Sequence, residues 1–439
     1  MTSSKSIDRE APVQGAVVIH PDREGRGVSR DADARLEEAV GLARALDLEV
    51  RETLIASLRR LTPATLFGKG KVEEIGLTIQ AVEADVAIVD DALTPVQQRN
   101  LEKAWQVKVI DRTGLILEIF ARRARTREGR LQVELARLSY ERSRLVRTWT
   151  HLERQRGGFG VMGGPGETQI ETDRRLLAEK IGKLKRELTE VRRTRTLQRS
   201  ARGRVPYPTV ALVGYTNAGK STLFNRLTQS EVVAEDMLFA TLDPTLRMLK
   251  LPDGRPAILS DTVGFISDLP HELVEAFRAT LEEVKEADVV LHVRDIASPE
   301  SQAQAQDVRT VLERLGVDMD ERSILEVWNK VDLLPEDARA AVAGDARRAH
   351  PPAVLVSAVT GEGCPQLLST VAGLVDEAPP VDVYAPAGEG AAIAWLYRHG
   401  RVIERNEGKD GSVRLAVSLS AQALGQFEQL FPSSEIRPH

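Results

Sequence analysis

The sequence predicts an α/β fold. A domain with a mainly parallel sheet is preceded by a small α/β domain and an antiparallel coiled-coil arm, and is followed by a small α+β domain. Short apolar runs alternate with helix-like stretches, which is typical of parallel sheets. One of these runs leads into a GxxxxGK[ST] motif. Between the two alternating regions, leucines recur every seven residues, which is typical of a coiled coil.

Composition favours a protein of the cytoplasm. The 439 residues are 42% apolar, enough for roughly two to four domains with real cores. The single cysteine, Cys364, excludes a disulfide framework and a cysteine-based zinc site. No apolar run approaches the roughly 18 residues of a membrane span, and the start of the chain lacks an apolar signal core. We expect a cytoplasmic monomer with no membrane span.

The first domain is expected over 13–120, after a disordered start at 1–12. Its predicted strands and helices alternate along the chain. The strands are 16–19, 48–50, 85–90 and 107–111, and the helices are 36–46, 72–82 and 95–105. The adjacent acids Asp90 and Asp91 follow a strand, where such a pair is usually a solvated turn.

The arm is expected over 121–204, where 23 Lys and Arg stand against 10 Asp and Glu. This balance of +13 contrasts with −18 in the rest of the chain and indicates an anionic partner, for which we expect nucleic acid. The alternative is a solvated helix face. Heptads predict two helices that fold back on each other, although Arg142 interrupts the first of them. The heptad positions are Leu131, Leu138, Leu145 and Leu152, then Ile170, Leu177, Leu184 and Val191.

A glycine-rich loop at 157–169 is expected at the tip of this arm. Residues 158–163 match the dinucleotide pattern GxGxxG, but they follow a charged helix rather than a strand, so we do not expect a dinucleotide there. Glycines allow the backbone to approach RNA closely, and the flanking Arg154, Arg156, Arg174 and Arg175 could contact phosphates. The alternative is a floppy hairpin end. Residues 199–206 are expected to form a linker.

The central domain is expected over 205–377 and the last domain over 378–439. The predicted strands of the central domain are 210–214, 257–261, 288–295, 324–329 and 354–357. The last domain is predicted to contain a strand, a helix at 391–399, a turn at 408–411 between two strands, and a final helix.

Residues 214–221, GYTNAGKS, form a phosphate-binding loop (P-loop) between a strand and a helix, where the motif must lie. Its backbone N–H groups can cradle phosphates. Lys220 would reach the β- and γ-phosphates, and the Ser221 hydroxyl would bind Mg²⁺. This pattern is far less frequent by chance than GxGxxG, so the P-loop predicts the nucleotide site.

Three later motifs turn this phosphate site into a predicted guanine site. DTVG at 261–264 supplies Asp261 for Mg²⁺ and the Gly264 amide for the γ-phosphate. NKVD at 329–332 supplies the Asp332 carboxylate, which can accept both N–H donors of the guanine edge. FATLD at 239–243 is predicted as the first switch, in which Thr241 completes the Mg²⁺ shell.

The predicted site residues fall into three groups. The catalytic residues are Lys220, Thr241 and Gly264, and the metal-binding residues are Ser221, Thr241 and Asp261. The nucleotide-binding residues are Gly214, Tyr215, Thr216, Asn217, Ala218, Gly219, Lys220, Ser221, Thr222, Phe239, Ala240, Thr241, Leu242, Asp243, Asp261, Thr262, Val263, Gly264, Asn329, Lys330, Val331, Asp332, Ser357, Ala358 and Val359.

With these motifs, the chain resembles the HflX-type GTPases, a ribosome-associated branch of the translation-factor class of P-loop GTPases. GPGETQIETDRR at 164–175 is similar to that family's own signature, and LFGKGK at 66–71 is similar to its N-terminal turn. The resemblance implies GTP hydrolysis, and binding to the 50S subunit and its rRNA through the N-terminal domain and the arm. It also implies splitting or rescue of stalled or stressed 70S ribosomes, with the arm's tip near the peptidyl transferase centre.

Several alternatives stay open at this stage. The GTPase could act on another structured RNA, in ribosome assembly or tRNA modification. The chain could also be a non-catalytic coiled-coil adaptor that the nucleotide only orders. The family has been linked to ATP at its N-terminal domain, but Lys69 and Lys71 could equally form a solvated turn or contact RNA.

The catalytic step is expected to be slow without a partner. Many switch GTPases place a glutamine after DxxG to orient the attacking water, and here that position is Phe265. We therefore expect ribosomes to stimulate hydrolysis. In related GTPases an asparagine in the P-loop helps to hold K⁺; Asn217 could do so here, or could only tie down the loop.

Overall fold

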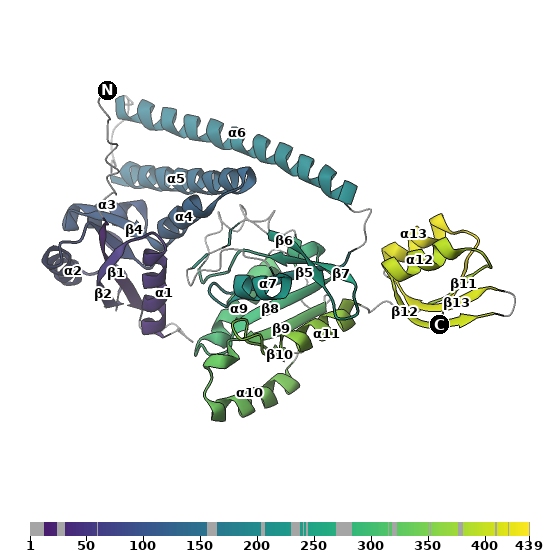
Figure 1. The fold of residues 1–439 in the computed structure, drawn as a ribbon. Helices are drawn as coiled ribbons and strands as arrows, with labels where there is room; N and C mark the ends of the chain where they lie inside the picture. Colours follow the sequence, from purple (N-terminus) through teal and green to yellow (C-terminus); the bar gives the residue numbers. More distant parts are fainter. Residues whose placement is uncertain are drawn as a thin grey trace, which may run out of the picture. The chain divides into compact units, whose positions relative to one another are not determined.

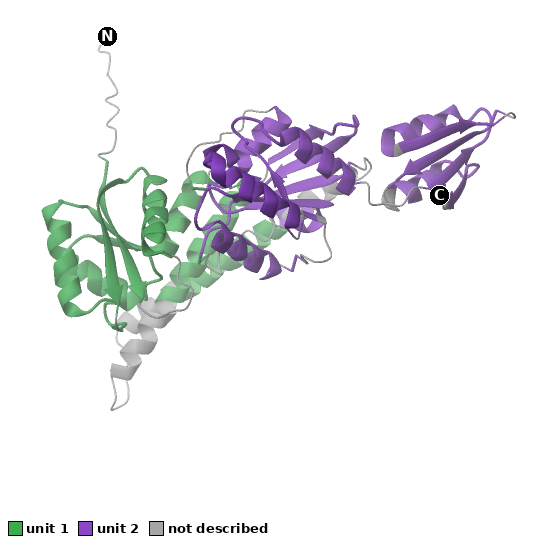
Figure 2. Ribbon diagram, turned by 90° about the horizontal axis from the view of Figure 1, so that it is seen from below, with its two compact units in different colours: residues 1–189, 236–242, 268–277 green, residues 190–235, 243–267, 278–439 purple. Residues whose placement is uncertain are grey.

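The computed structural model describes most of the chain in sixteen stretches. They are 13–23, 31–58, 60–155, 165–202, 207–229, 238–239, 241–242, 245–268, 283–314, 316–317, 323–349, 351, 353–375, 381–408, 411–419 and 421–438. The chain forms two compact units (Figure 2). Unit 1 contains 1–189, 236–242 and 268–277, and unit 2 contains 190–235, 243–267 and 278–439. The finer domain boundaries stay predictions.

Unit 1 contains a parallel four-stranded sheet in the order β2-β1-β3-β4 (Figure 1). Helices α2 and α3 pack on one face, over a core that includes Ile19, Ile75 and Trp105. The predicted elements are present, and α4 is an additional one. In chain order they are β1 (Gly15–Arg23), α1 (Ala32–Arg44), β2 (Glu49–Leu58), α2 (Lys69–Ala81), β3 (Val86–Val89), α3 (Pro95–Trp105), β4 (Lys108–Asp111) and α4 (Arg112–Arg123).

Two long helices follow, α5 (Arg127–Gln155) and α6 (Pro165–Arg202). Helix α6 begins inside the stretch predicted as a loop and runs into the predicted linker, so both predictions were too wide. Proline is favoured in the first turn of a helix because its φ is already helical, which suits a start at Pro165. The heptad residues Leu131 and Leu184 are buried, but a coiled-coil pairing stays a prediction. Residues 156–164 of the glycine-rich tip lie outside the described residues.

Unit 2 contains the six-stranded sheet β10-β9-β8-β5-β7-β6, in which only β6 is antiparallel to its neighbour. All five predicted strands are present, and β6 is additional. The elements are β5 (Thr209–Gly214), α7 (Lys220–Thr228), β6 (Thr245–Lys250), β7 (Pro256–Asp261), β8 (Val289–Asp295), α9 (Ser301–Arg314), β9 (Ser323–Asn329), the 3-10 helix η1 (Val331–Leu333), α10 (Glu336–Arg348), β10 (Ala353–Leu355) and α11 (Cys364–Val375). Because the central strands are parallel, their carboxyl ends meet at one edge, where α/β sheets bind ligands.

The last part of the chain forms an antiparallel sheet in the order β12-β13-β11-β14. Its elements are β11 (Val381–Ala385), α12 (Gly390–His399), β12 (Arg401–Glu407), β13 (Val413–Ser418), α13 (Ala421–Leu430) and β14 (Glu435–Pro438). The terminal strand β14 was not predicted. With it, the order of elements becomes β-α-β-β-α-β, the split βαβ arrangement. Among the described residues, no helix combines the length and apolarity that a bilayer crossing needs.

Candidate nucleotide site

The P-loop lies between β5 and α7, and its lysine points back into the loop. Lys220 is buried, and its Nζ donates hydrogen bonds to the carbonyl oxygens of Gly214 (3.1 Å) and Tyr215 (2.8 Å). Burial lowers the pKa of Lys220 to about 8, against the opposing effect of the Asp261 charge. The Thr216 hydroxyl is buried and has no hydrogen-bond partner among the described residues. A charged lysine and an unused donor within one loop suit an anionic phosphate.

Asp261 and Ser221 meet beside this loop. Strand β7 pairs with β5, and this brings Asp261, the last residue of β7, next to the first turn of α7. The Ser221 Oγ donates to Asp261 Oδ2 at 2.8 Å. A hydroxyl and a carboxylate oxygen at this separation are the hard oxygen ligands that Mg²⁺ prefers. These two residues of the predicted metal set therefore come together.

The DTVG segment lies directly against the P-loop. The Phe265 amide donates to the Gly214 carbonyl (3.1 Å), and the Thr216 amide donates to the Phe265 carbonyl (2.7 Å). A Cβ on Gly264 would lie 2.9 Å from Thr216 Cγ2 and 3.1 Å from Lys220 Nζ. Only glycine fits this close approach. The Phe265 side chain is 2% exposed, and with no polar atom it cannot replace the missing glutamine.

Asn329 of the NKVD motif connects the predicted base-binding side of the site to the P-loop. The Asn329 amide donates from Nδ2 to the Ala218 carbonyl (2.8 Å) and accepts at Oδ1 from the Ala358 amide (2.9 Å). A Cβ on Gly219, which has a φ of +88°, would lie 2.2 Å from Asn329 Nδ2. One side chain therefore joins the P-loop, the end of β9 and the Ser357–Val359 loop.

The other residues of the motif are also placed. Lys330 forms an ion pair with Asp295 at 2.9 Å. Asp332 lies in η1, and no hydrogen bond to its carboxylate is found among the described residues. Val359 is exposed, whereas Ser357 and Ala358 are buried.

The first-switch residues belong to a different unit. Phe239, Thr241 and Leu242 are buried in unit 1, whereas the P-loop belongs to unit 2. Ala240 and Asp243 lie outside the described residues. Within unit 2 the structure brings Ser221 and Asp261 together, and the place of Thr241 in the metal set stays a prediction.

Sequence reasoning missed two residues that support the site. Arg226 on α7 donates from Nε to the Ala358 carbonyl at 3.1 Å, and Asp295 at the end of β8 pairs with Lys330. No motif spacing marks either residue; their positions on neighbouring elements are the only signal.

Asp90 after strand β3 and the lysines at the start of α2 also have partners. Asp90 is buried and contacts His20 and Arg112, so the expected solvated turn was wrong for this residue. Burial by itself would raise the pKa of Asp90, but the charge of Arg112 outweighs this effect together with the contact with His20. The pKa of Asp90 therefore lies below its usual value. Lys71 pairs with Glu74 at 2.8 Å, and Lys69 is almost fully exposed.

Comparison with known proteins covers nearly the whole chain. Family models match as "GTP-binding GTPase N-terminal" over 33–121, "GTP-binding GTPase Middle Region" over 123–202, "50S ribosome-binding GTPase" over 209–330 and "HflX C-terminal domain" over 344–434. The GTPase HflX of Magnetococcus marinus is 54% identical over 403 residues, 91% of this chain and 92% of the relative. That of Escherichia coli K12 is 46% identical, covering 94% and 95%. A solved GTP-binding protein of Sulfolobus solfataricus in complex with GDP has a TM-score of 0.44 at 24% identity, covering 83% of this chain and 99% of its own.

Proposed function

This chain belongs to the HflX family of GTPases, and on that premise we propose that it associates with the 50S ribosomal subunit and splits or rescues stalled or stressed 70S ribosomes. The observation that carries the proposal is the match of its own P-loop region to the 50S ribosome-binding GTPases, together with a basic arm next to that region in sequence. The same match favours the ribosome over another structured RNA.

Each motif is assigned a role in binding GTP and GDP. The P-loop amides and Lys220 hold the phosphates, and the Gly264 amide meets the γ-phosphate. The Asp332 carboxylate accepts from the guanine edge, while Asn329 keeps the P-loop and the Ser357–Val359 loop in register. The contact of Ser221 with Asp261 supports Mg²⁺ binding there, with Thr241 as the third ligand. When bound, Mg²⁺ would neutralise charge on the phosphates.

Hydrolysis is proposed to be slow in the free protein and stimulated by ribosomes, because Phe265 cannot orient water. Asn217 is exposed at the P-loop with a φ of +59°, a position that suits either a K⁺ ligand or a simple turn residue. Turnover in KCl and in NaCl, with and without 50S subunits, separates the two roles. Identical rates in both salts would remove the K⁺ role, and fast turnover unchanged by subunits would remove the stimulation.

The proposal is tested by sedimentation of ribosomes with the purified chain. With a non-hydrolysable GTP analogue, the protein should migrate with 50S subunits, and the 70S peak should shrink as the subunit peaks grow. The same run with GDP is the control. Migration with free tRNA or with an assembly intermediate, and an intact 70S peak, would favour action on another RNA. Binding without any GTP turnover would favour the adaptor.

A further inference from the structure

Residues close to two nucleotide motifs belong to unit 1. The first segment is the described part of 236–242, which is Leu238, Phe239, Thr241 and Leu242 and includes residues of the first switch. The second position is Asp268, four residues after Gly264 of DTVG. The helices that these residues contact are α1 and α4, which contact each other.

Phe239 is the main anchor of the first segment. Its side chain is 2% exposed and lies edge-on against Phe120 of α4, with ring centroids 4.6 Å apart and an interplanar angle of 74°. Its φ of +59° is unusual for a residue that is not glycine. Packing therefore holds Phe239 in a conformation that its backbone does not favour.

Helix α1 makes room for the neighbouring residue. A Cβ on Gly41 would lie 3.1 Å from Leu238 Cδ1, so the glycine leaves space for this side chain. Asp268 forms an ion pair with the Arg35 guanidinium of α1. Leu238 and Asp268 therefore both lie against α1, whereas Phe239 packs on α4.

We propose that Phe120 is a positioning residue for GTP binding and hydrolysis: it anchors the switch segment that carries Thr241 through the ring of Phe239. Thr241 lies two residues after Phe239, so a fixed Phe239 limits the positions that Thr241 can reach. An ordered switch is required for γ-phosphate sensing in GTPases. An anchor that already restricts the segment lowers the entropy cost of ordering it. The proposal rests on the role given to Thr241 above.

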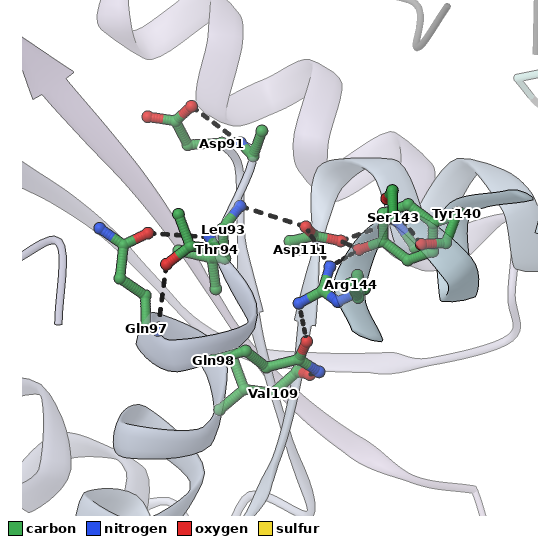
Figure 3. Close-up of polar contacts among 12 residues, drawn as sticks. Asp91, Leu93, Thr94, Gln97, Gln98, Val109, Asp111, Tyr140, Ser143 and Arg144 are labelled. Carbon is green, nitrogen blue, oxygen red and sulfur yellow. Dashed lines mark hydrogen bonds and ion pairs between the residues drawn. The ribbon is translucent and has the colours of Figure 1, made fainter. Parts of the chain in front are cut away.

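Helix α4 links this anchor to the base of α5. The Asp111 carboxylate caps α4 by accepting from the Gly114 amide (2.8 Å), and it also accepts from the Tyr140 hydroxyl of α5 (2.7 Å). Figure 3 shows Asp111 together with Tyr140 and Arg144 of α5. The ring that contacts Phe239 therefore lies on the 12-residue helix α4, and the residue that caps this helix also contacts α5.

The test uses the full-length Phe120→Leu variant, with Phe67→Leu as the matched control. Phe67 is also fully buried in unit 1, but it packs against Trp105. We measure affinities for a non-hydrolysable GTP analogue and for GDP, and kcat and KM for GTP. Phe120→Leu should weaken binding of the GTP analogue by about three- to tenfold relative to binding of GDP, a change on the scale of one aromatic pair. It should also lower kcat. Phe67→Leu should leave the ratio of the two affinities unchanged.

A double-mutant cycle of Phe120 and Phe239 measures whether the two rings act together on the ratio of GTP to GDP affinity. A purely structural role of Phe120 would not change this ratio. If the two rings act together, Phe239→Leu should resemble Phe120→Leu, and the double variant should add little to either. Additive losses, or a Phe120→Leu variant that behaves like Phe67→Leu or hydrolyses GTP faster than the unmodified chain, would overturn the proposal. If Thr241→Ala itself leaves the preference for GTP over GDP unchanged, the role of Thr241 fails instead.

Discussion

Asp332 is the residue to which we assign base selection. Its carboxylate can accept two hydrogen bonds from guanine, an arrangement that adenine cannot match. In Asp332→Asn, one carboxylate oxygen that accepts a hydrogen bond is replaced by an amide NH₂ group, which would face an N–H donor of guanine. We expect GTP affinity to fall by at least about a hundredfold, since hydrogen bonds to charged groups are strong and an unmatched one is costly. Fluorescence titration with GTP, ATP and XTP measures this.

The same substitution at Asp337 is the matched control, because Asp337 is exposed on the neighbouring helix α10. XTP, whose base presents a carbonyl in place of the guanine amino group, should regain affinity in Asp332→Asn. Equal binding of GTP and ATP by the unmodified chain would contradict the guanine assignment.

His292 is expected to make the stability of the domain that contains the central sheet depend on pH. It is fully buried on β8, and neither ring nitrogen has a hydrogen-bond partner among the described residues. Burial lowers its pKa to about 4; Glu326 opposes this effect, while Arg294, Arg309 and Lys220 add to it. The neutral form of His292 is therefore favoured in the folded state. Its contribution to the free energy of unfolding is complete above the unfolded pKa of about 6.5 and is lost as pH falls towards 4.

The predicted consequence is a loss of about 2 kcal/mol of the free energy of unfolding between pH 7 and pH 5 from this one residue. His292→Leu should lose correspondingly less over the same interval. Urea unfolding of both proteins at the two pH values measures the difference, with His399→Leu in the C-terminal sheet domain as the control. Parallel losses in His292→Leu and the unmodified chain would contradict the prediction.

At the scale of elements, α5 is fastened to the N-terminal sheet by one polar cluster (Figure 3). Asp111 is 2% exposed and accepts from the Leu93 amide (3.1 Å) and the Arg144 guanidinium (3.2 Å), besides Tyr140 and Gly114. Burial raises the pKa of Asp111, and Arg144 is the main opposing influence. Arg144 also contacts Gln98 of α3, so the cluster joins α3, β4 and α5.

Removing Arg144 should loosen this attachment. Arg144→Ala leaves a buried carboxylate without its cation, so we expect unit 1 to lose about 3 kcal/mol of stability. Arg137→Ala on the same helix is the control, because Arg137 is exposed and its ion pair among the described residues is with Glu141, at 3.2 Å. This substitution should cost less than about 1 kcal/mol. Hydrogen exchange of the α3 and α5 amides would locate the change. Equal effects of the two substitutions would mean that the cluster does not hold α5.

At the scale of the whole molecule, charge is divided between segments. The stretch 121–204 carries +13, although the chain as a whole carries −5. Contacts with RNA phosphates release counterions, so the affinity for 50S subunits should fall steeply between about 50 and 200 mM salt. Exposed arginines such as Arg174 are the expected contributors.

Arg174→Gln should reduce the salt slope by about one unit if this residue meets a phosphate. The control is Arg348→Gln: Arg348 is also exposed, lies on α10 and pairs with Asp345, and its substitution should leave the slope unchanged. Co-sedimentation across a salt series measures both. A flat salt dependence for the unmodified chain would mean that the arginines form only a solvated face.

The sequence alone determined five of the six strands of the central sheet and the order of its nucleotide motifs. The P-loop, DTVG and NKVD each combine a strand with a few adjacent residues, so their chemistry follows from short spacings. Parallel strands then bring their ends together, which is why Ser221 and Asp261 could be paired before the fold was known.

Only the tertiary structure decided which distant residues support these motifs. The contacts of Phe120 with Phe239 and of Arg226 with Ala358 join residues more than a hundred positions apart, and no local pattern marks them. The start of α6 at Pro165 and the strand β14 were also missed. A helix can begin at a proline even where several glycines lie close by in the sequence. A strand of four residues is too short to show the alternation of apolar and polar residues that predicts a strand. The physical reason is common to these cases. The chemistry of a motif depends on residues that are neighbours in sequence, whereas packing depends on which distant residues the folded chain brings into contact.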